Sequence, residues 1–367
     1  LMARVIPVFK NGDRFHVDNY RPISLTCCCC KMIEHIVANH ILNVLEKNKT
    51  LSPFQHGFRK GFSTVTQLVT AVHSFSSILD HSGQIDVLFL DLSKAFDRVP
   101  HGSLLLKLKQ AGIPSTLVNW VNSYLKDRTQ FVDIDGTCSS SLTVTSGVPQ
   151  GSVLGPLLFL LYVNDLVSVV GDTVNIGMFA DDIMIYTEVQ SASDQHRLDR
   201  ALCDISSWCD KWGMKISTTK TVLLRITRKR NPITFRYKIK NTLIEEVSKF
   251  KYLGIVLNSR LDWNDHVQQV TSSALKKLGL LRHKLRGTPS NVKLLAYNSI
   301  IRPKLEYAAV VWDPHTNKNI NELEKVQRRA VRFIYNKYKR SDSPSGIMAL
   351  NKIQPLHIRR QIWRLIP

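Results

Sequence analysis

Two apolar segments that carry aspartates restrict the fold of this chain more than any other feature of its sequence. The first, Val87–Leu90, is uniformly apolar, which predicts a strand covered on both faces, and Asp91 follows it directly. The second, residues 173–187, consists of two apolar stretches around Asp181 and Asp182, which predicts a β-hairpin with its charges at the tip. The fold must therefore place carboxylates at the ends of buried strands.

Carboxylates in such positions repel one another unless a positive charge lies between them. Hard oxygen ligands select magnesium or manganese. Two such ions stabilise both the attacking and the leaving oxygen of an in-line phosphoryl displacement. Acids are also common at solvated strand ends, so Asp91 alone does not decide between the two interpretations. Asp91, Asp181 and Asp182, together with the motifs that surround them, favour a metal site.

The rest of the pattern predicts alternating helices and strands, followed by a helical C-terminal part. Apolar residues at helical spacing predict helices over residues 31–45, 63–79, 101–111, 115–126, 152–166 and 198–212. The apolar face of the first helix consists of Ile33, Ile36, Val37, Ile41 and Val44. Strand patterns cover residues 5–9, 221–226, 233–238 and 252–257, with a hairpin over 130–145. From residue 265 the pattern is helical, with interruptions at Pro289 and near Pro314.

Charge divides the chain into two unequal parts. Residues 1–210 carry 17 Lys and Arg against 20 Asp and Glu, a net charge of −3, whereas residues 211–367 carry 33 against 9, a net charge of +24. Together they give the formal net charge of +21. This asymmetry indicates chemistry in the first part and polyanion binding in the second. The alternative is that the basic faces are only solvated.

Length and cysteine usage narrow the class further. A chain of 367 residues exceeds the usual size of one domain, so two or three subdomains with a shared core are expected. The longest apolar run, Val153–Val163, is too short to cross a bilayer, which predicts a soluble protein without a membrane segment. The first residue is Leu1 rather than methionine, and we expect a piece of a longer chain.

Four of the seven cysteines form the run Cys27–Cys30. Four adjacent residues cannot all turn toward one tetrahedral metal ion, so a structural zinc site is not expected. We expect these side chains to act as small apolar groups near a helix start, in a reducing compartment.

Three segments resemble, in their order and spacing, the core motifs of reverse transcriptases. They are FLDLSKAFD at residues 89–97, GVPQGSVLGP at 147–156 and FADD at 179–182. Further matches are NYRPISL at 19–25, HGFR at 56–59, VNDL at 163–166 and FKYLG at 250–254. The resemblance covers roughly residues 5–340 and is strongest to the non-LTR retrotransposons of the jockey and LINE type.

The resemblance implies an α+β fold with the right-hand polymerase architecture. Fingers would occupy residues 1–85, the palm with its antiparallel sheet and a fingers-like insertion residues 86–258, and a helical thumb and connection, expected to be truncated, residues 259–367. It also implies the reaction, in which a primer 3′-hydroxyl attacks a deoxynucleotide on an RNA template. The implied partners are an RNA template, a DNA primer, target DNA and deoxynucleoside triphosphates, with Mg²⁺ as cofactor and Mn²⁺ as an alternative. Such an enzyme is expected inside the cell, in the cytoplasm as a ribonucleoprotein and in the nucleus during insertion.

The resemblance also assigns roles around the aspartates. Asp91 and Asp181 are implied as the principal metal ligands, with Asp182 and the backbone carbonyl of Leu92 in support. Phe96 resembles the steric gate, an aromatic side chain that lies where a ribose 2′-hydroxyl would be. The alternative for Phe96 is that it only fills the core.

Substrate contacts follow from the same resemblance. Gln150 and Gly151 resemble the pocket for the base pair and nucleotide, where glycine permits close approach of the backbone. Lys10 and Arg21 match residues of the fingers that hold the incoming triphosphate. The alternative for Arg21, which precedes a proline, is an ordinary loop charge.

Residues outside these motifs also match positions of the family. Lys220 resembles a lysine that protonates the leaving pyrophosphate, although the family pattern has asparagine three residues earlier, where this chain has Ser217. Arg59 belongs to a motif implied in nucleic-acid binding, and the loop of Tyr252, Leu253 and Gly254 resembles the one that positions the primer end. Phosphate contacts are expected from the basic residues that follow, namely Lys276, Lys277, Arg282, Lys284, Arg286, Arg328, Arg329 and Arg332.

Two other functions have to be weighed against this one. A decayed copy of a mobile element would be a non-catalytic RNA-binding protein, but decay strikes motif residues as readily as others, and here the acids, Gln150, Gly151 and Phe96 are all present. An RNA-templated RNA polymerase would recognise the 2′-hydroxyl with polar groups. The aromatic side chain of Phe96 argues against that activity.

Overall fold

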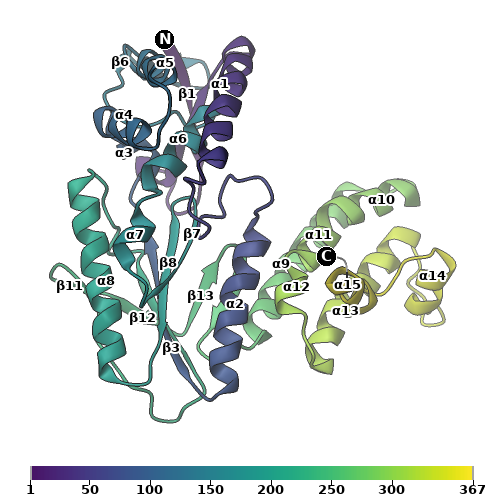
Figure 1. Ribbon diagram of the computed structural model, residues 1–367. Coiled ribbons are helices and arrows are strands. Elements are labelled where there is room, and N and C mark those ends of the chain that lie inside the picture. Colours follow the sequence, from purple (N-terminus) through teal and green to yellow (C-terminus); the bar gives the residue numbers. More distant parts are fainter. Residues whose placement is uncertain (1, 366–367) are drawn as a thin grey trace. The chain divides into compact units, whose positions relative to one another are not determined.

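The computed structural model describes residues 2–365, which form two compact units (Figure 1). The first unit contains the residues up to Gln67, together with Gln84–Leu223 and Asn231–Glu246. The second unit contains Leu68–Gly83, Leu224–Arg230 and the residues from Val247 onward. Three elements have residues in both units: α2 (Thr64–Asp80), β9 (Val222–Thr227) and β12 (Glu245–Val247).

A mixed sheet opens the first unit. β1 (Met2–Phe9) pairs antiparallel with β2 (Tyr20–Leu25), after a short 3₁₀ turn at Val17–Asn19, and parallel with β4 (Thr129–Ile134). β4 also pairs with β5 (Thr137–Cys138) and β6 (Leu142–Thr143). Between β4 and β5, Asp135 and Gly136 both have positive φ angles, 50° and 89°, as a tight hairpin turn requires. The hairpin predicted over 130–145 is confirmed.

An antiparallel sheet at the centre of the first unit carries the two segments that the sequence singled out. β3 (Gln84–Asp91) pairs with β8 (Asp182–Glu188), which pairs in turn with β7 (Asn175–Phe179). Val87–Leu90 are all buried, as the uniformly apolar run predicts, and so are residues 84–86. α8 (Ala192–Lys211) packs against β8 (Figure 1).

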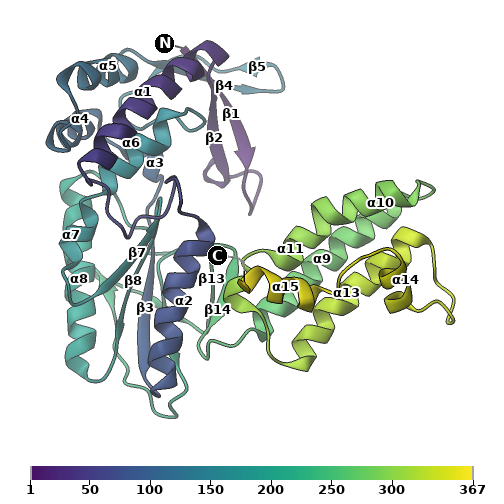
Figure 2. The same cartoon turned by 45° about the vertical axis from the view of Figure 1, so that its right-hand side comes forward.

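One helix of the first unit, α6 (Leu154–Val163), is almost completely buried. Every residue of α6 except Pro156 is buried, and the helix packs against α1 and α4 (Figure 2). This agrees with a helix that is apolar on all sides. The bounds of the other helices are α1 (Cys28–Lys47), α3 (Ala95–Arg98), α4 (His101–Gln110), α5 (Ser115–Leu125) and α7 (Leu166–Val170).

The buried face of α1 differs from the predicted one. Ile33 and Ile36 are exposed, whereas Glu34 is only 1% exposed. The Glu34 carboxylate accepts hydrogen bonds from the backbone N–H groups of Val153 and Leu154, at 2.6 and 3.1 Å, and so caps the start of α6. A polar contact with another helix therefore helps to determine which face of α1 is buried, and apolar periodicity alone does not predict that face.

The cysteine run lies at the start of α1, as predicted, but it does not pack as small apolar groups. Cys27 is the N-cap residue, and its Sγ accepts a hydrogen bond from the N–H of Cys30 at 3.3 Å. Cys27, Cys28 and Cys29 are exposed free thiols. They remain outside because the buried face of α1 begins only at Glu34.

The strand predicted over 233–238 is wrong. Only Lys238 lies in a strand, the short β10 (Lys238–Ile239), which pairs with β11 (Thr242–Leu243). Side-chain amides replace a strand partner at Ile233: its N–H donates to Gln84 Oε1 at 2.9 Å, and its carbonyl accepts from Gln84 and Gln195 at 2.7 and 3.0 Å. The backbone N–H and carbonyl of Ile233 thus have hydrogen-bond partners without a neighbouring strand.

The second unit begins with a hairpin and continues as helices. β13 (Lys249–Tyr252) and β14 (Ile255–Asn258) replace the single strand predicted over 252–257, because Leu253 and Gly254 adopt positive φ angles of 42° and 92° and reverse the chain. The helical breaks predicted at Pro289 and near Pro314 are confirmed. The helices are α9 (Asn264–Lys284), α10 (Ser290–Ala296) with a π-helical turn at Tyr297–Ile301, α11 (Arg302–Glu306), α12 (Ala309–Trp312), α13 (Asn317–Tyr335), α14 (Pro344–Leu350) and α15 (Leu356–Leu365). None of the helices within residues 2–365 has the length and apolar composition that crossing a bilayer requires.

His266 of α9 joins the hairpin to the helices of this unit. Its ring is buried, accepts a hydrogen bond from the N–H of Val256 at 3.2 Å and packs edge-on against Trp312. Its Nε2 has no hydrogen-bond partner among the described residues. Burial, with a smaller contribution from the charge of Lys251, lowers the pKa of His266 to about 4.

We expect the free energy of unfolding to fall as the pH drops from 6.5 toward 4. In that range the unfolded chain binds a proton at this histidine and the folded chain does not. The free energy of unfolding is therefore highest above pH 6.5 and falls by about 3 kcal/mol in total as the pH drops. His266→Phe should remove this part of the pH dependence in urea titrations at pH 7 and 4.5. His283→Phe, an exposed position on the same helix, is the control. An equal acid sensitivity of His266→Phe and the unmodified protein would contradict the assignment.

Candidate active site

The three aspartates meet at one end of the central sheet. In the pairing of β3 with β8, Asp91 lies opposite Asp182, and in the pairing of β7 with β8, Phe179 lies opposite Asp182. Ala180 and Asp181 are thus the two residues of the turn between β7 and β8. The predicted hairpin with its acids at the tip is confirmed.

This turn is strained, because its first residue is not glycine. Ala180 has a φ of +57°, where its Cβ is crowded by the backbone. Such a conformation costs about 1–2 kcal/mol and persists only where the surrounding contacts hold it. Asp181 follows directly, so the conformation of Ala180 determines where that carboxylate points.

Burial and mutual repulsion change the titration of these acids. Burial raises the pKa of Asp182 to about 6, with further contributions from the charges of Asp181 and Asp91. Burial also raises the pKa of Asp181, and Asp91 adds to this effect. Burial and mutual repulsion at the tip of the sheet thus outweigh the nearby positive charges.

The donor atoms at the tip suit a hard divalent cation, which would relieve the repulsion among Asp91, Asp181 and Asp182. As the side chains stand, no group of three or more His, Cys, Asp or Glu side chains within residues 2–365 is arranged as a metal site. The fit to a metal ion therefore lies in the chemical type of the donors.

The segment after α8 packs against the end of β3. The N–H of Ser217 donates to the carbonyl of Asp91 at 2.8 Å, and Thr221 Oγ1 accepts from the N–H of Asp91 at 3.5 Å. Leu92 forms a backbone bridge to the same segment. Lys220 Nζ lies 3.7 Å from Asp91 Oδ2. The structure thus brings the predicted proton donor beside a predicted metal ligand.

Phe96 lies in α3 and is half-buried. Its ring stacks on Phe159, with centroids 4.4 Å apart, and meets Phe58 edge-on at 6.4 Å. Phe159 is fully buried in α6, whereas Phe58 is exposed. One face of Phe96 is therefore fixed by the core while part of the ring remains accessible, an arrangement that a steric gate requires.

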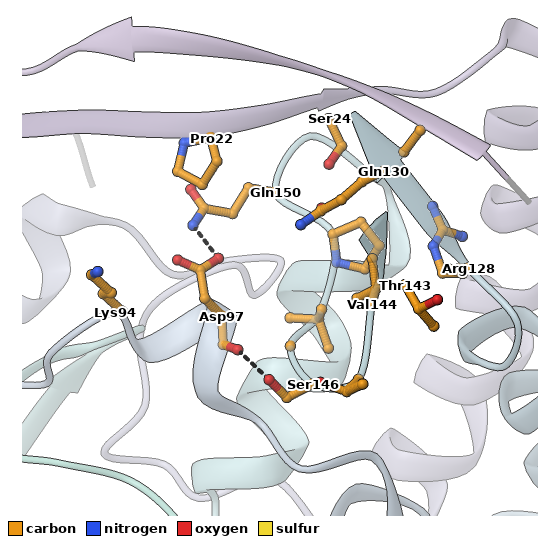
Figure 3. Close-up of a pocket in the computed structure, with 15 residues that line it drawn as sticks. Pro22, Ser24, Lys94, Asp97, Arg128, Gln130, Thr143, Val144, Ser146 and Gln150 are labelled. Carbon is orange, nitrogen blue, oxygen red and sulfur yellow. Dashed lines mark hydrogen bonds between the residues drawn. The ribbon is translucent and has the colours of Figure 1, made fainter. Parts of the chain in front are cut away.

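Gln150 is held through both its side chain and its backbone. Its Nε2 donates to Asp97 Oδ1 at 2.9 Å (Figure 3), and its carbonyl accepts from the N–H of Ser24 in β2 at 2.8 Å. Gly151 has a φ of +105°, and a Cβ at this position would lie 2.7 Å from the carbonyl oxygen of Ser24. Only glycine fits there, by conformation and by space.

Gln150 and Asp97 line a hollow of about 390 Å³ (Figure 3). Its other polar side chains include Lys94, Arg128 and Ser146, and the Ser146 hydroxyl donates to the carbonyl of Asp97 at 3.0 Å. Sequence reasoning missed Asp97. The available signal was its place directly after Phe96 within the motif FLDLSKAFD.

Lys10 and Arg21 lie at the β1–β2 hairpin and are exposed. The N–H of Lys10 donates to the carbonyl of Asn19 at 2.8 Å, which closes the hairpin. The positive charges of both residues lower the pKa of Asp181, against the larger effect of burial. The structure thus brings these two cations within electrostatic reach of the acidic tip.

Two arginines predicted to contact nucleic acid also make hydrogen bonds within the fold. The Arg59 guanidinium donates to the carbonyls of Ser52 and Gln55 and lies over the ring of Phe62. The Arg332 guanidinium donates to three carbonyls in residues 337–342.

The other predicted contacts lie at the surface of the second unit. Arg328 is half-buried. The exposed members are Lys276, Lys277, Arg282, Lys284, Arg286 and Arg329.

The turn predicted to position a primer is fixed by a tyrosine. Tyr252 is buried, and the carbonyl of Leu253 accepts a hydrogen bond from the Tyr307 hydroxyl at 2.8 Å. A Cβ on Gly254 would lie 2.7 Å from the Tyr307 ring. Glycine is therefore required where the ring covers the turn.

Comparison with known proteins identifies the family in which these motifs occur. A family model described as reverse transcriptase (RNA-dependent DNA polymerase) matches residues 8–257. The chain is 30% identical over 345 residues to the probable RNA-directed DNA polymerase from transposon BS of Drosophila melanogaster, covering 91% of this chain and 38% of that protein. It is 29% identical over 343 residues to the RNA-directed DNA polymerase from mobile element jockey of the same species, covering 90% and 37%. The chain thus spans less than two fifths of the length of these relatives.

Among solved structures, apo telomerase from Candida tropicalis superposes with a TM-score of 0.51 at 10% identity, covering 97% of this chain and 61% of that chain. At this identity the likeness concerns the fold alone. Together with the family match, it confirms the predicted α+β right-hand polymerase fold.

Removing one acid from the tip should stabilise the metal-free protein at neutral pH. Because the pKa of Asp182 is raised to about 6, the folded chain loses stability as the pH rises from about 4 through 6. Asp182→Asn should therefore unfold at a higher urea concentration than the unmodified protein at pH 7 in the presence of a chelator, and the gain should vanish near pH 4. Asp172→Asn, an exposed acid elsewhere, should show no such gain. A gain that persists at pH 4 would assign it to packing rather than to charge.

Proposed function

Since the chain belongs to the reverse transcriptase family, we propose that it is the RNA-directed DNA polymerase region of a non-LTR mobile element. The primer 3′-hydroxyl attacks the α-phosphate of a deoxynucleoside triphosphate on an RNA template, and pyrophosphate leaves. One observation carries the proposal: the backbone register sets Asp91 opposite Asp182 and next to the turn that holds Asp181, within the motifs of this family.

Reverse transcriptases work with divalent metal ions. Here Asp91 and Asp181 would hold Mg²⁺, or Mn²⁺, with Asp182 and the carbonyl of Leu92 in support. When bound, such ions stabilise the charge that develops on the attacking and leaving oxygens.

The side chains around the acids bind and orient the substrate. Arg21 and Lys10 hold the triphosphate, a guanidinium through paired hydrogen bonds and an ammonium as a point charge. Gln150, fixed by Asp97, lines the nucleotide pocket with Gly151. These groups orient the nucleotide before it reacts, which converts binding energy into rate.

Proton transfer and sugar selection fall to two further residues. Lys220, beside Asp91, donates a proton to the leaving pyrophosphate. Phe96 excludes the 2′-hydroxyl of ribonucleotides.

The nucleic acid is bound mainly by backbone contacts. We assign residues 1–85 to the fingers, 86–258 to the palm and 259–367 to the thumb and connection. The turn of Leu253 and Gly254 supports the primer end, and the exposed basic residues of α9 bind phosphates. The element acts as a cytoplasmic ribonucleoprotein with its RNA and inserts into target DNA in the nucleus.

Asp91→Ala and Asp181→Ala should each lower primer extension by more than roughly 100-fold, since such groups stabilise charge in the transition state. Binding to an RNA/DNA hybrid should be nearly unchanged. The measurement is extension of poly(rA)/oligo(dT) with Mg²⁺, beside the affinity for the same hybrid, with Asp172→Ala as the control.

A variant that keeps more than a tenth of the unmodified rate would contradict the role of that aspartate. Hybrid binding without extension by the unmodified protein would favour a non-catalytic RNA-binding remnant instead.

Phe96→Ala should increase the use of ribonucleotides relative to deoxynucleotides by roughly 5- to 150-fold, because a ribose would otherwise overpack the ring at a cost of about 1–3 kcal/mol. Single-nucleotide incorporation with matched deoxy and ribo substrates, beside thermal unfolding, provides the measurement. Core filling alone predicts an unstable protein that loses both activities in parallel. An unchanged ratio in a stably folded variant would exclude the steric gate.

A further inference from the structure

The loop that precedes α2 extends the edge of the catalytic hairpin. Gln55 pairs in parallel with Met178 of β7, the N–H of His56 donates to the carbonyl of Met178 at 2.9 Å, and the N–H of Met178 donates to the carbonyl of Phe54 at 2.9 Å. Residues 54–56 thus act as one more strand segment beside β7. The loop is attached to the hairpin at the step before its turn.

The side chain of Gln55 continues this pairing onto the turn itself. Its Oε1 accepts from the N–H of Ala180 at 2.9 Å, and its Nε2 donates to the carbonyl of Ala180 at 3.4 Å. The same Oε1 accepts from the N–H of Gly57 at 2.8 Å. Gln55 is 1% exposed, so water does not compete for these groups. A carboxamide carries a donor group beside an acceptor group, which matches the two backbone groups of Ala180.

Gly57 approaches the same turn from the backbone side. A Cβ on Gly57 would lie 2.4 Å from the nitrogen of Ala180 and 3.1 Å from the Gln55 Oε1. The loop therefore holds the turn by a side chain at one residue and by contact with a bare backbone at another. Both contacts act on Ala180, the strained residue with a φ of +57° that directly precedes Asp181.

We propose that Gln55 is a positioning residue of this polymerase, whose side-chain amide fixes the conformation of Ala180 and thereby the direction of the Asp181 carboxylate. The inference rests on the proposed function for its kinetic part. The Gln55 side chain binds backbone groups of Ala180 and Gly57, so it acts through the turn. A buried glutamine that only satisfies its neighbours would affect stability without affecting the geometry of Asp181.

The test compares two changes that disturb Ala180 by different means with two matched controls. Gln55→Met keeps the length of the side chain and removes its hydrogen bonds. Gly57→Ala keeps the glutamine but places a Cβ too close to the nitrogen of Ala180. Gln195→Met removes another buried glutamine, which donates to Asp86 and to the carbonyl of Ile233. Gly102→Ala adds a Cβ where no atom lies within 4 Å.

Two quantities are measured for each variant. The first is the single-turnover incorporation rate on an RNA/DNA hybrid, corrected for the folded fraction from thermal unfolding, and the same experiment gives the nucleotide Kd. The second is the affinity of the protein alone for Mn²⁺, from the paramagnetic resonance signal of the free ion. Gln55→Met and Gly57→Ala should each lower the rate about 10- to 100-fold with a change in nucleotide Kd below about 3-fold, and weaken Mn²⁺ binding about 5-fold or more. Gln195→Met and Gly102→Ala should keep both quantities within about 3-fold per folded molecule.

A rate and a Mn²⁺ affinity of Gln55→Met that stay within 3-fold of the unmodified protein would overturn the proposal. Equal losses in Gln195→Met would do the same, because they would show a general effect of destabilisation. If Gln55→Met does not fold, Gly57→Ala carries the test. An unmodified protein that binds Mn²⁺ but does not extend a primer would refute the proposed function, while the Mn²⁺ affinities of the variants would still decide on Gln55.

Discussion

The pairing of β3 with β8 is the constraint on which the rest of the site depends. It buries Leu88 and Leu90 against Ile183 and Ile185 in the core of the first unit and, in the same register, fixes Asp91 opposite Asp182. A slip of one residue would move each of these side chains to the opposite face of the sheet and disrupt this packing, so the core holds the acids together. The burial that stabilises the strands also raises the pKa of the acids at their end. Apolar packing thus creates a site whose repulsion at neutral pH a bound cation would relieve.

A few polar contacts connect the loops of the site to this core. Glu34 caps α6, Asp97 holds Gln150 in the loop before α6, and Gln55 holds Ala180 in the turn before β8. Each contact joins residues more than fifty positions apart in the sequence, and those of Glu34 and Gln55 bind backbone groups that lack a partner in a helix or strand. Groups fixed in this way need little reorganisation when a substrate binds, which favours catalysis.

The sequence predicted the elements that depend on local periodicity and missed those that depend on distant partners. The strand before Asp91 and the acidic hairpin follow from apolar runs, which burial on both faces dictates. Residues 233–238 have strand-like composition, but two glutamines satisfy Ile233 instead of a neighbouring strand. The buried face of α1 differs from the predicted one because it includes Glu34, whose hydrogen-bond partner lies in another helix. The acids, Phe96 and Gln150 were found through motifs, whereas Asp97 and Gln55 act through contacts that periodicity does not encode.

Composition shows where the positive charge lies along the chain, and the structure shows which of these charges are exposed. Residues 211–367 are strongly basic, but not all of their cations face solvent: Arg332 binds carbonyls of its own loop, and the buried Arg360 pairs with Asp313 at 2.7 Å. The cations that remain exposed include five between Lys276 and Arg286, on α9 and just after it. A surface of this kind attracts phosphates through the release of counterions and does not read bases. That suits an enzyme in which base pairing with the template, rather than contact with the protein, selects the nucleotide.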